Sequence, residues 1–390
     1  MARMNVASSA DMQTVNLALQ GGGSHGAFTW GVLDTLLADD RIAIEGLSGT
    51  SAGAVNAVAL ASGYAKGLAA GHDPRKSARE SLARVWGEIS NLGALGAMQQ
   101  RLAGMMWGGL PKEFAPTNIM ATAWRSLLSP AQANPLDINP LRNLLEREID
   151  FEAIARSRHL KVFVSATHVN TGRAVIFTGE QVTAQAVMAS ACLPTLFRAV
   201  EIDGESYWDG GYSVNPPLTP LIQSCDSRNL MLVQINPLKR EHAPRSTPEI
   251  LDRINELTFN ASLLTQMRSI DFVNRLIEEG NLKSGRCKHV LLHRIDGGAG
   301  MAAYPASSRG STDATLISKL FELGQANAAQ WLTRHHSALG QHSTVNIRRD
   351  YLDDTREETA AAPGAAQVHR GFTPWLARLY RRAKAAGASN

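Results

Sequence analysis

The chain has 390 residues, of which 44% are hydrophobic, and its formal net charge at pH 7 is +4. That hydrophobic content is enough for a large core, and no run of about 18 apolar residues predicts a transmembrane helix. The first residues lack the apolar segment of a secretory signal, and the three cysteines are too scattered for a disulfide framework or a metal site. We therefore expect a cytoplasmic protein without a metal or other cofactor, with disorder at residues 1–12.

A strand, a glycine loop and a helix are predicted in close succession near the start of the chain. Residues 15–19 are an apolar run typical of a buried strand, and residues 28–37 carry apolar side chains at helical spacing. Between them stands Gly-Gly-Gly-Ser-His-Gly, residues 21–26. Because glycines lack Cβ, their backbone N–H groups can approach a substrate oxygen closely. Such donors stabilise the oxyanion that forms during acyl transfer.

The next segment predicts a nucleophile on a sharp turn. Residues 42–47 indicate a second strand, and Gly-Thr-Ser-Ala-Gly follows at residues 49–53, with Ser51 at its centre. An alanine-rich helix comes next, and we expect it to end at Gly63. A strand, a tight G-x-S-x-G turn and a helix together favour a strained elbow that exposes the serine. In a parallel sheet the loops after these two strands emerge at the same edge, so Ser51 should face the glycine loop.

Two other interpretations stay open on these residues alone. The glycines of residues 21–26 also satisfy G-x-G-x-x-G, the dinucleotide fingerprint, and Glu45 lies near the expected downstream acid. However, Glu45 precedes the elbow, which occupies the end of that strand. The loop is itself a second G-x-S-x-G, which makes Ser24 a rival nucleophile.

A serine nucleophile needs a base, and the sequence offers two kinds. His289 and His293 lie in a strand-like run and would suit a Ser-His-Asp esterase. Asp209 lies in Tyr-Trp-Asp-Gly-Gly-Tyr, which is typical of a hairpin turn because Asp-Gly is a favoured turn pair. Alternatively, burial beside the aromatic side chains raises the pKa of the Asp209 carboxyl and makes it the base.

The rest of the chain predicts alternating strands and helices. Strands are expected at residues 160–164, 174–177 and 230–235. Helices are expected from residue 140, over residues 247–280 with Thr247 as the N-cap, and over residues 312–332. Residues 85–135 collect Met and Trp among glycines and prolines. That composition is typical either of a lid or acyl-binding wall, or of extra packed helices.

The end of the chain predicts a membrane-binding helix. Residues 355–369 indicate a linker, and residues 370–390 form a basic amphipathic pattern with five Lys and Arg residues and no acid. This segment suits an anionic membrane surface. The expected membrane contacts are Trp375, Leu379, Arg378, Arg381 and Arg382. Because the remainder of the chain is not basic, we do not expect nucleic acid as a partner.

Three blocks in order carry a resemblance to a known family. They are the glycine loop at residues 21–26, the elbow at 49–53 and Asp-Gly-Gly at 209–211. Together they resemble the patatin-like phospholipase family. Residues 189–194 are similar to the family's segment before its catalytic aspartate, and Asn-Pro-Pro at 215–217 also fits.

The resemblance implies an α/β fold of three layers, α/β/α, with a mainly parallel central sheet in a catalytic domain at residues 13–225. Residues 226–354 would form a C-terminal part of strands and long helices, similar to the extension of some bacterial members. The implied chemistry is hydrolysis of lipid esters through an acyl-enzyme, with Ser51 as nucleophile and Asp209 as its base. The implied oxyanion hole consists of the amides of Gly21, Gly22 and Gly23. Supporting motif positions are Gly26, Gly49, Gly53, Gly210 and Gly211.

One position departs from the family pattern. Members usually carry Arg or Lys just before the last glycine of the loop, where this chain has His25. The departure leaves phospholipid, neutral lipid and other hydrophobic esters open as substrates. Outside the enzymes, the alternative is a non-catalytic membrane or lipid-granule binding protein. The sequence also leaves homo-oligomerisation open.

Overall fold

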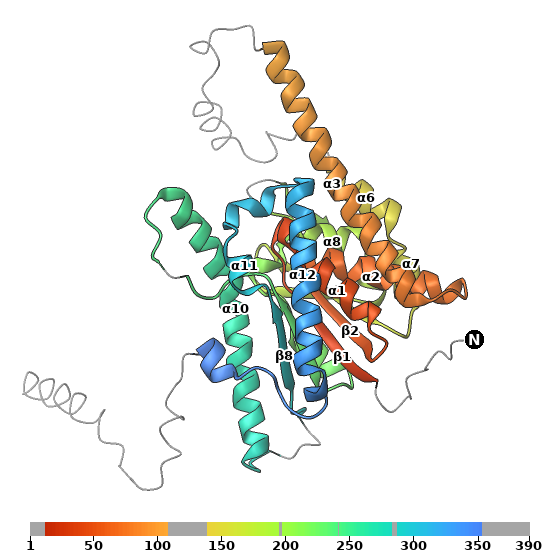
Figure 1. The fold of residues 1–390 in the computed structure, drawn as a ribbon, viewed down its shortest axis with the longest axis vertical. Helices are drawn as coiled ribbons and strands as arrows, with labels where there is room; N and C mark the ends of the chain where they lie inside the picture. Colours follow the sequence, from red (N-terminus) through yellow and green to blue (C-terminus); the bar gives the residue numbers. More distant parts are fainter. Residues whose placement is uncertain (1–11, 108–138, 195–196, 241, 283–286, 353–390) are drawn as a thin grey trace, which may run out of the picture. The chain divides into compact units, whose positions relative to one another are not determined.

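The computed structural model describes residues 12–107, 139–194, 197–240, 242–282 and 287–352 (Figure 1). The chain divides into two units, Met1–Leu352 and Asp353–Asn390, and only the first contains described residues. The expectations for residues 1–11, for the part of the 85–135 region beyond residue 107, and for the linker and basic tail therefore lie outside the described residues.

An eight-stranded sheet organises the described part of the chain. Its strands are β1 (Gln13–Leu19), β2 (Ile42–Thr50), β3 (Lys161–His168), β4 (Ala174–Thr178), β5 (Val200–Ile202), β6 (Glu205–Asp209), β7 (Asn229–Gln234) and β8 (Leu291–Asp296). Hydrogen-bonded neighbours follow the order β5-β6-β3-β2-β1-β7-β8, and β4 also pairs with β3. The run from β3 through β2, β1 and β7 to β8 is parallel, whereas β4, β5 and β6 add antiparallel pairs, so the sheet is mixed.

Helices cover both faces of this sheet. The longer elements are α1 (Gly26–Ala38), α2 (Ala52–Ala69), α3 (Pro74–Trp107), α6 (Pro140–Glu148), α7 (Phe151–Arg156), α8 (Ala184–Ser190), α9 (Thr219–Ser224), α10 (Thr247–Glu278), α11 (Gly298–Ala302) and α12 (Ala314–His335). Short turns of helix are η1 (Gly23–His25), η2 (Gly179–Gln181), η3 (Gly210–Tyr212), η4 (Ala306–Gly310), η5 (His336–Ala338) and η6 (Arg348–Leu352).

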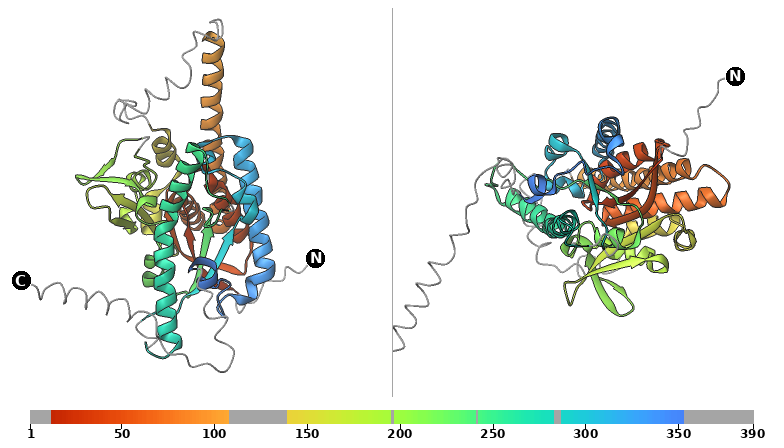
Figure 2. Two further views of the ribbon diagram at one scale, coloured as in Figure 1. Left: turned by 90° about the vertical axis from the view of Figure 1, so that its left-hand side faces the viewer. Right: turned by 90° about the horizontal axis from the view of Figure 1, so that it is seen from below.

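Alternation along the strands produces two hydrophobic clusters, one on each face. Leu17 of β1 belongs to the cluster that includes α1, α2 and α12, whereas the next residue, Ala18, belongs to the cluster that includes α9 and α10. Figure 2 shows α10 and α12 on opposite sides of the strands. The expected three-layer α/β/α fold is therefore confirmed, and β7 and β8 from the C-terminal part complete the same sheet as β1.

Two helix boundaries differ from the sequence expectation. The prediction that the elbow helix ends at Gly63 is wrong, because α2 continues to Ala69. Gly63 instead allows close packing on α3, since an added Cβ would lie 2.7 Å from the Cα of Ala78. Helix α10 begins at Thr247 as a first helical residue, and its N-cap is Ser246, which forms a capping box with Glu249.

The start of the Met- and Trp-rich region is part of a long helix. Trp86 lies in α3, is 2% exposed and donates its indole N–H to Asn56 Oδ1 at 2.8 Å.

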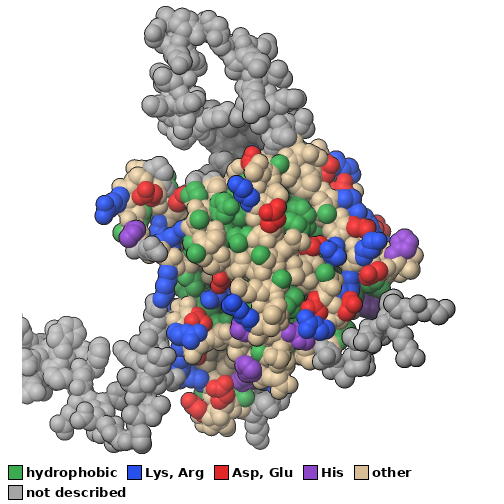
Figure 3. Space-filling view, viewed as in Figure 1, with side chains coloured by type: hydrophobic (Ala, Val, Ile, Leu, Met, Phe, Trp, Pro, Cys, Tyr) green, Lys and Arg blue, Asp and Glu red, His purple; other side chains and the backbone are tan. Residues whose placement is uncertain are grey.

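Within the described residues, no helix is both long and apolar enough to cross a membrane. On the face seen in Figure 3, Lys and Arg side chains are interspersed with Asp and Glu.

Candidate active site

Ser51 occupies a strained turn between β2 and α2. Its φ is 54° and its ψ is −122°, a backbone conformation that side-chain-bearing residues rarely adopt. The flanking glycines allow the turn to close. A Cβ added to Gly49 would lie 2.4 Å from the carbonyl carbon of Gly53. A Cβ added to Gly53 would lie 2.1 Å from the carbonyl oxygen of Leu19. The elbow predicted from the sequence is therefore present, with Ser51 at its apex.

The glycine loop packs directly on this elbow. An added Cβ at Gly21 would lie 2.5 Å from the Thr50 carbonyl oxygen and 2.8 Å from Ser51 Cβ. The Gly21 amide is not available as an oxyanion donor, because it donates to Asn215 Oδ1 at 2.7 Å. Among the described residues, the amides of Gly22 and Gly23 have no hydrogen-bond acceptor. Of the three amides expected to form the oxyanion hole, those of Gly22 and Gly23 are therefore the two without an acceptor among the described residues.

Strand β3 brings Asp209 beside the elbow. Strand β4 pairs along one edge of β3, so β2 and β6 follow one another along the other edge. Thr50, the last residue of β2, is paired with Ser165, and Asp209, the last residue of β6, is paired with the next residue, Ala166. The two strands therefore end at adjacent positions of β3, and Ser51 and Asp209 meet there.

The turn after Asp209 is a short helix rather than the hairpin considered from the sequence. Asp209 caps η3 and its Oδ1 accepts the Gly211 amide at 2.7 Å. The glycines are required by close packing. An added Cβ at Gly210 would lie 2.4 Å from the Ser165 carbonyl oxygen, and at Gly211 it would lie 2.3 Å from the Phe259 ring.

Asp209 has the chemistry of a base. Its side chain is 1% exposed, and burial raises its pKa from 3.8 to about 7, although the Gly211 amide and a hydrogen bond from the Ser51 side chain lower it. Oδ2 is buried without a well-formed hydrogen bond among the described residues, so the Ser51 contact is loose. Catalytic hydrogen bonds are often long in the absence of substrate. A carboxyl with a pKa near 7 can accept a proton and release it again at neutral pH.

Two residues that support this pair were not assigned roles from the sequence. Ser190, the last residue of α8, accepts the Ser51 amide through its Oγ at 2.8 Å. Cys192 accepts the Asp209 amide through its carbonyl oxygen at 2.8 Å. The family-like segment at residues 189–194 thus holds both members of the pair, and its resemblance was the signal that could have indicated this.

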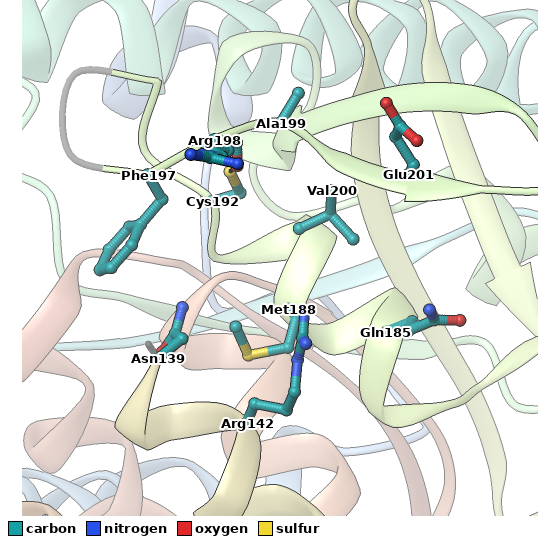
Figure 4. Close-up of a pocket in the computed structure, with 10 residues that line it drawn as sticks. All are labelled: Asn139, Arg142, Gln185, Met188, Cys192, Phe197, Arg198, Ala199, Val200 and Glu201. Atoms are coloured by element: carbon teal, nitrogen blue, oxygen red, sulfur yellow. Dashed lines mark hydrogen bonds between the residues drawn. The ribbon is translucent and has the colours of Figure 1, made fainter. Parts of the chain in front are cut away.

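A cavity of about 440 Å³ adjoins that segment. Figure 4 shows Phe197, Arg198 and Val200 above it, with Met188 of α8 and Arg142 of α6 below. Cys192 contributes to its wall. The cavity therefore shares one chain segment with the Ser51–Asp209 pair.

The structure does not bring either candidate histidine to Ser51. His289 precedes β8 and its Nε2 lies 2.8 Å from Glu278 Oε1. His293 is fully buried, with its Nε2 3.3 Å from Oδ1 of Asn229, the first residue of β7. Because β7 runs parallel to β1 and β2, its first residue lies where these strands begin, whereas the elbow lies where β2 ends.

The other two alternatives also lack the geometry they require. Ser24 is 6% exposed and donates its hydroxyl to the carbonyl oxygen of Ser311, so it is engaged away from a base. Glu45 accepts the amides of Asp226 and Ser227, which precede β7. Glu45 therefore lies away from the glycine loop and cannot act as the acid of a dinucleotide site there.

His25 is a neutral packing residue. It is 2% exposed, and its Nε2 lies 2.7 Å from Ser308 Oγ. Burial lowers the pKa of His25 to about 4, and the positive charge of Arg309 adds to this effect. In the described part of the chain, no group of three His, Cys, Asp or Glu side chains is arranged to hold a metal ion.

The N-terminal half of the chain matches a known protein family. The sequence model of the patatin-like phospholipase family matches residues 17–222, just over half of the chain. Among solved structures, VipD from Legionella pneumophila is similar with a TM-score of 0.39 and 13% identity, over 90% of this chain and 74% of that one. A search of curated proteins found no match. The family match covers the glycine loop, the Ser51 elbow and Asp209, and the chain belongs to the patatin-like phospholipase family.

Proposed function

We propose that this protein is a serine acyl-hydrolase that cleaves ester bonds of lipids or phospholipids with a Ser51–Asp209 dyad. Membership of the family supports lipid hydrolase activity in general. The observation that carries the specific proposal is the meeting of a strained serine with a buried carboxyl whose pKa is about 7. Neither His289 nor His293, the two histidines considered as bases, lies beside this pair.

The reaction has two halves. In the first, Ser51 Oγ attacks the ester carbonyl carbon while Asp209 takes the hydroxyl proton, and that proton then passes to the departing alcohol. In the second, Asp209 takes a proton from water, which attacks the acyl-enzyme carbonyl carbon; the bond to Ser51 Oγ then breaks, the proton passes from Asp209 to that oxygen, and the fatty acid leaves. The amides of Gly22 and Gly23 hold the oxyanion in both halves, and losing one such donor typically lowers the rate about 100- to 1000-fold.

Association with a membrane surface belongs to this proposal. A lipid hydrolase must reach aggregated substrate, and the basic amphipathic pattern of residues 370–390 suits an anionic surface. A basic amphipathic helix that lies on a membrane surface makes a peripheral contact. The head group and acyl chain are left open by the neutral His25 at the family's usual cationic position.

Intact-protein mass after treatment with a fluorophosphonate tests the dyad. We expect one adduct on the wild type, none on Ser51→Ala, and slower labelling of Asp209→Asn. Matched controls are Ser24→Ala, His289→Ala and His293→Ala, which should label like the wild type. An adduct that disappears with Ser24 would move the nucleophile. No adduct on folded wild type, with lipid binding retained, would favour the non-catalytic binding protein.

A further inference from the structure

Two buried asparagines grip the same peptide unit of the glycine loop. Asn215 accepts the Gly21 amide at 2.7 Å and donates its Nδ2 to the Gly21 carbonyl oxygen at 3.3 Å. Asn236 donates its Nδ2 to that same oxygen at 2.9 Å. The side chains are 0% and 1% exposed, so these bonds form away from bulk water.

This grip fixes the direction of the neighbouring amide. A trans peptide is planar, so the Gly21 carbonyl and the Gly22 N–H belong to one rigid unit and point in opposite directions. With the carbonyl oxygen held by two amide groups, the Gly22 N–H must face away from Asn215 and Asn236. It has no acceptor among the described residues, and Gly21 itself lies against Ser51.

The two asparagines are themselves held by the scaffold. Asn236 lies two residues after the end of β7, and Gln20 Oε1 accepts its backbone N–H at 2.9 Å and its Nδ2 at 3.2 Å. The backbone N–H of Asn215 donates to Ser262 Oγ of α10 at 3.1 Å. The peptide is therefore braced against the end of a strand and against a long helix, rather than by a loop that moves freely.

We propose that Asn215 and Asn236 are positioning residues for acyl transfer, which hold the Gly21–Gly22 peptide so that the Gly22 N–H points at the oxyanion. The inference rests on the proposed function of Ser51. Preorganised donors aimed at the charge that develops in the transition state lower the barrier more than donors that must turn. Because the ground-state carbonyl carries less charge, the effect falls on kcat rather than on KM.

Isosteric substitutions test this role. Asn215→Asp and Asn236→Asp keep the side-chain shape but replace the donor to the Gly21 oxygen with an acceptor, and the repulsion turns the peptide. We expect kcat for a soluble aryl ester to fall about 10- to 100-fold with KM within about 3-fold, as for partial loss of an oxyanion donor. The Ki of a trifluoromethyl ketone, which forms a tetrahedral adduct, should rise by the same factor.

Asn229→Asp is the matched control. Asn229 is also buried, at 5% exposure, but it begins β7 and bonds to Thr14 and Gly340, far from the glycine loop. It also places a carboxylate in the core, beside His293, and should leave kcat and the ketone Ki near wild-type values. Should the Asp variants fail to fold, Asn215→Ser and Asn236→Ser remove the same donor without a charge and carry the same expectation.

The outcomes separate this inference from the proposed function. Active wild type with equal kcat in all three Asn→Asp variants would overturn the positioning role and leave the dyad intact. A parallel loss of substrate binding, with KM raised and kcat retained, would also overturn it. Absence of Ser51-dependent turnover and labelling in the wild type would instead refute the dyad, and the positioning role with it.

Discussion

Replacing Asp209 with asparagine should stabilise the protein while abolishing its activity. The folded protein holds the Asp209 carboxyl at a pKa of about 7, against 3.8 ordinarily, because it is buried. Ionising it therefore lowers folding stability. That loss is absent below about pH 3.8, grows between pH 3.8 and 7, and is complete above about pH 7. In Asp209→Asn the side-chain amide would keep an acceptor for the Gly211 N–H and carry no charge at any pH.

The size of the gain follows from the pKa shift. A rise from 3.8 to about 7 corresponds to about 4 kcal/mol at 1.36 kcal/mol per unit, which is an upper value because the site relaxes. For a unit of roughly 350 residues the unfolding entropy is about 0.7 kcal/mol/K, so Tm should rise by up to about 6 °C. The gain should be present at pH 8.5 and much reduced at pH 5.

Thermal unfolding of wild type and Asp209→Asn at both pH values measures this. Asp350→Asn is the control with opposite sign. Burial opposes ionisation of Asp350, but the hydrogen bond and charge of Arg349 outweigh it and lower its pKa, so this substitution should not stabilise at pH 8.5. Wild-type kcat/KM on a soluble ester should also fall about tenfold per pH unit below about pH 7. A Tm difference that is equal at both pH values, with a flat activity profile down to pH 5, would refute the reasoning.

Three further changes to the chain have expected outcomes. His25→Arg should lower the free energy of unfolding by about 3 kcal/mol or more, because it buries a cation beside Arg309. His25→Gln should lower it less, and equal Tm values for the two variants would contradict this reasoning. Gly53→Ala should abolish turnover because its Cβ would lie 2.1 Å from a carbonyl oxygen. Gly87→Ala is its control: no atom lies within 4 Å of the added Cβ, so the substitution should stabilise α3 by about 0.5–1 kcal/mol in denaturant unfolding. Deleting residues 370–390 should weaken sedimentation with anionic vesicles, at about 1 kcal/mol per basic residue, without changing soluble-ester hydrolysis; unchanged vesicle binding would remove the tail from the proposal.

The sequence was sufficient to predict the elbow and the loop that faces it, because both depend on local rules. Glycines at residues 49 and 53 mark a turn that only small residues allow to close, and a parallel sheet brings successive loops to one edge. The same local rules misplaced the end of α2. A glycine that permits helix–helix contact, such as Gly63, is indistinguishable in sequence from one that ends a helix.

The support around the site could not be predicted, because it depends on contacts between distant parts of the chain. Asn215 is separated from Gly21 by 194 positions, and Asn236 by 215. Neither asparagine lies in a pattern that specifies its partner, although the family-like Asn-Pro-Pro run indicated that residue 215 matters. The environment of His25 is likewise set by Arg309, which an isolated reading of the loop does not reveal.

Three features near Ser51 lower stability, although buried polar atoms without a hydrogen-bond partner also occur elsewhere among the described residues. Ser51 has a positive φ, which typically costs about 1–3 kcal/mol, and Asp209 is buried with an oxygen that lacks a well-formed hydrogen bond. Asn236 likewise keeps a buried Oδ1 without a partner among the described residues. Substitution of Ser51 by glycine or of Asp209 by asparagine would relieve the first two of these, so a vestigial site has no physical reason to retain them. A strained serine beside a buried carboxyl of raised pKa, next to a glycine loop held by two asparagine side chains, is the combination that acyl transfer needs, and it favours catalysis over the lipid-binding alternative.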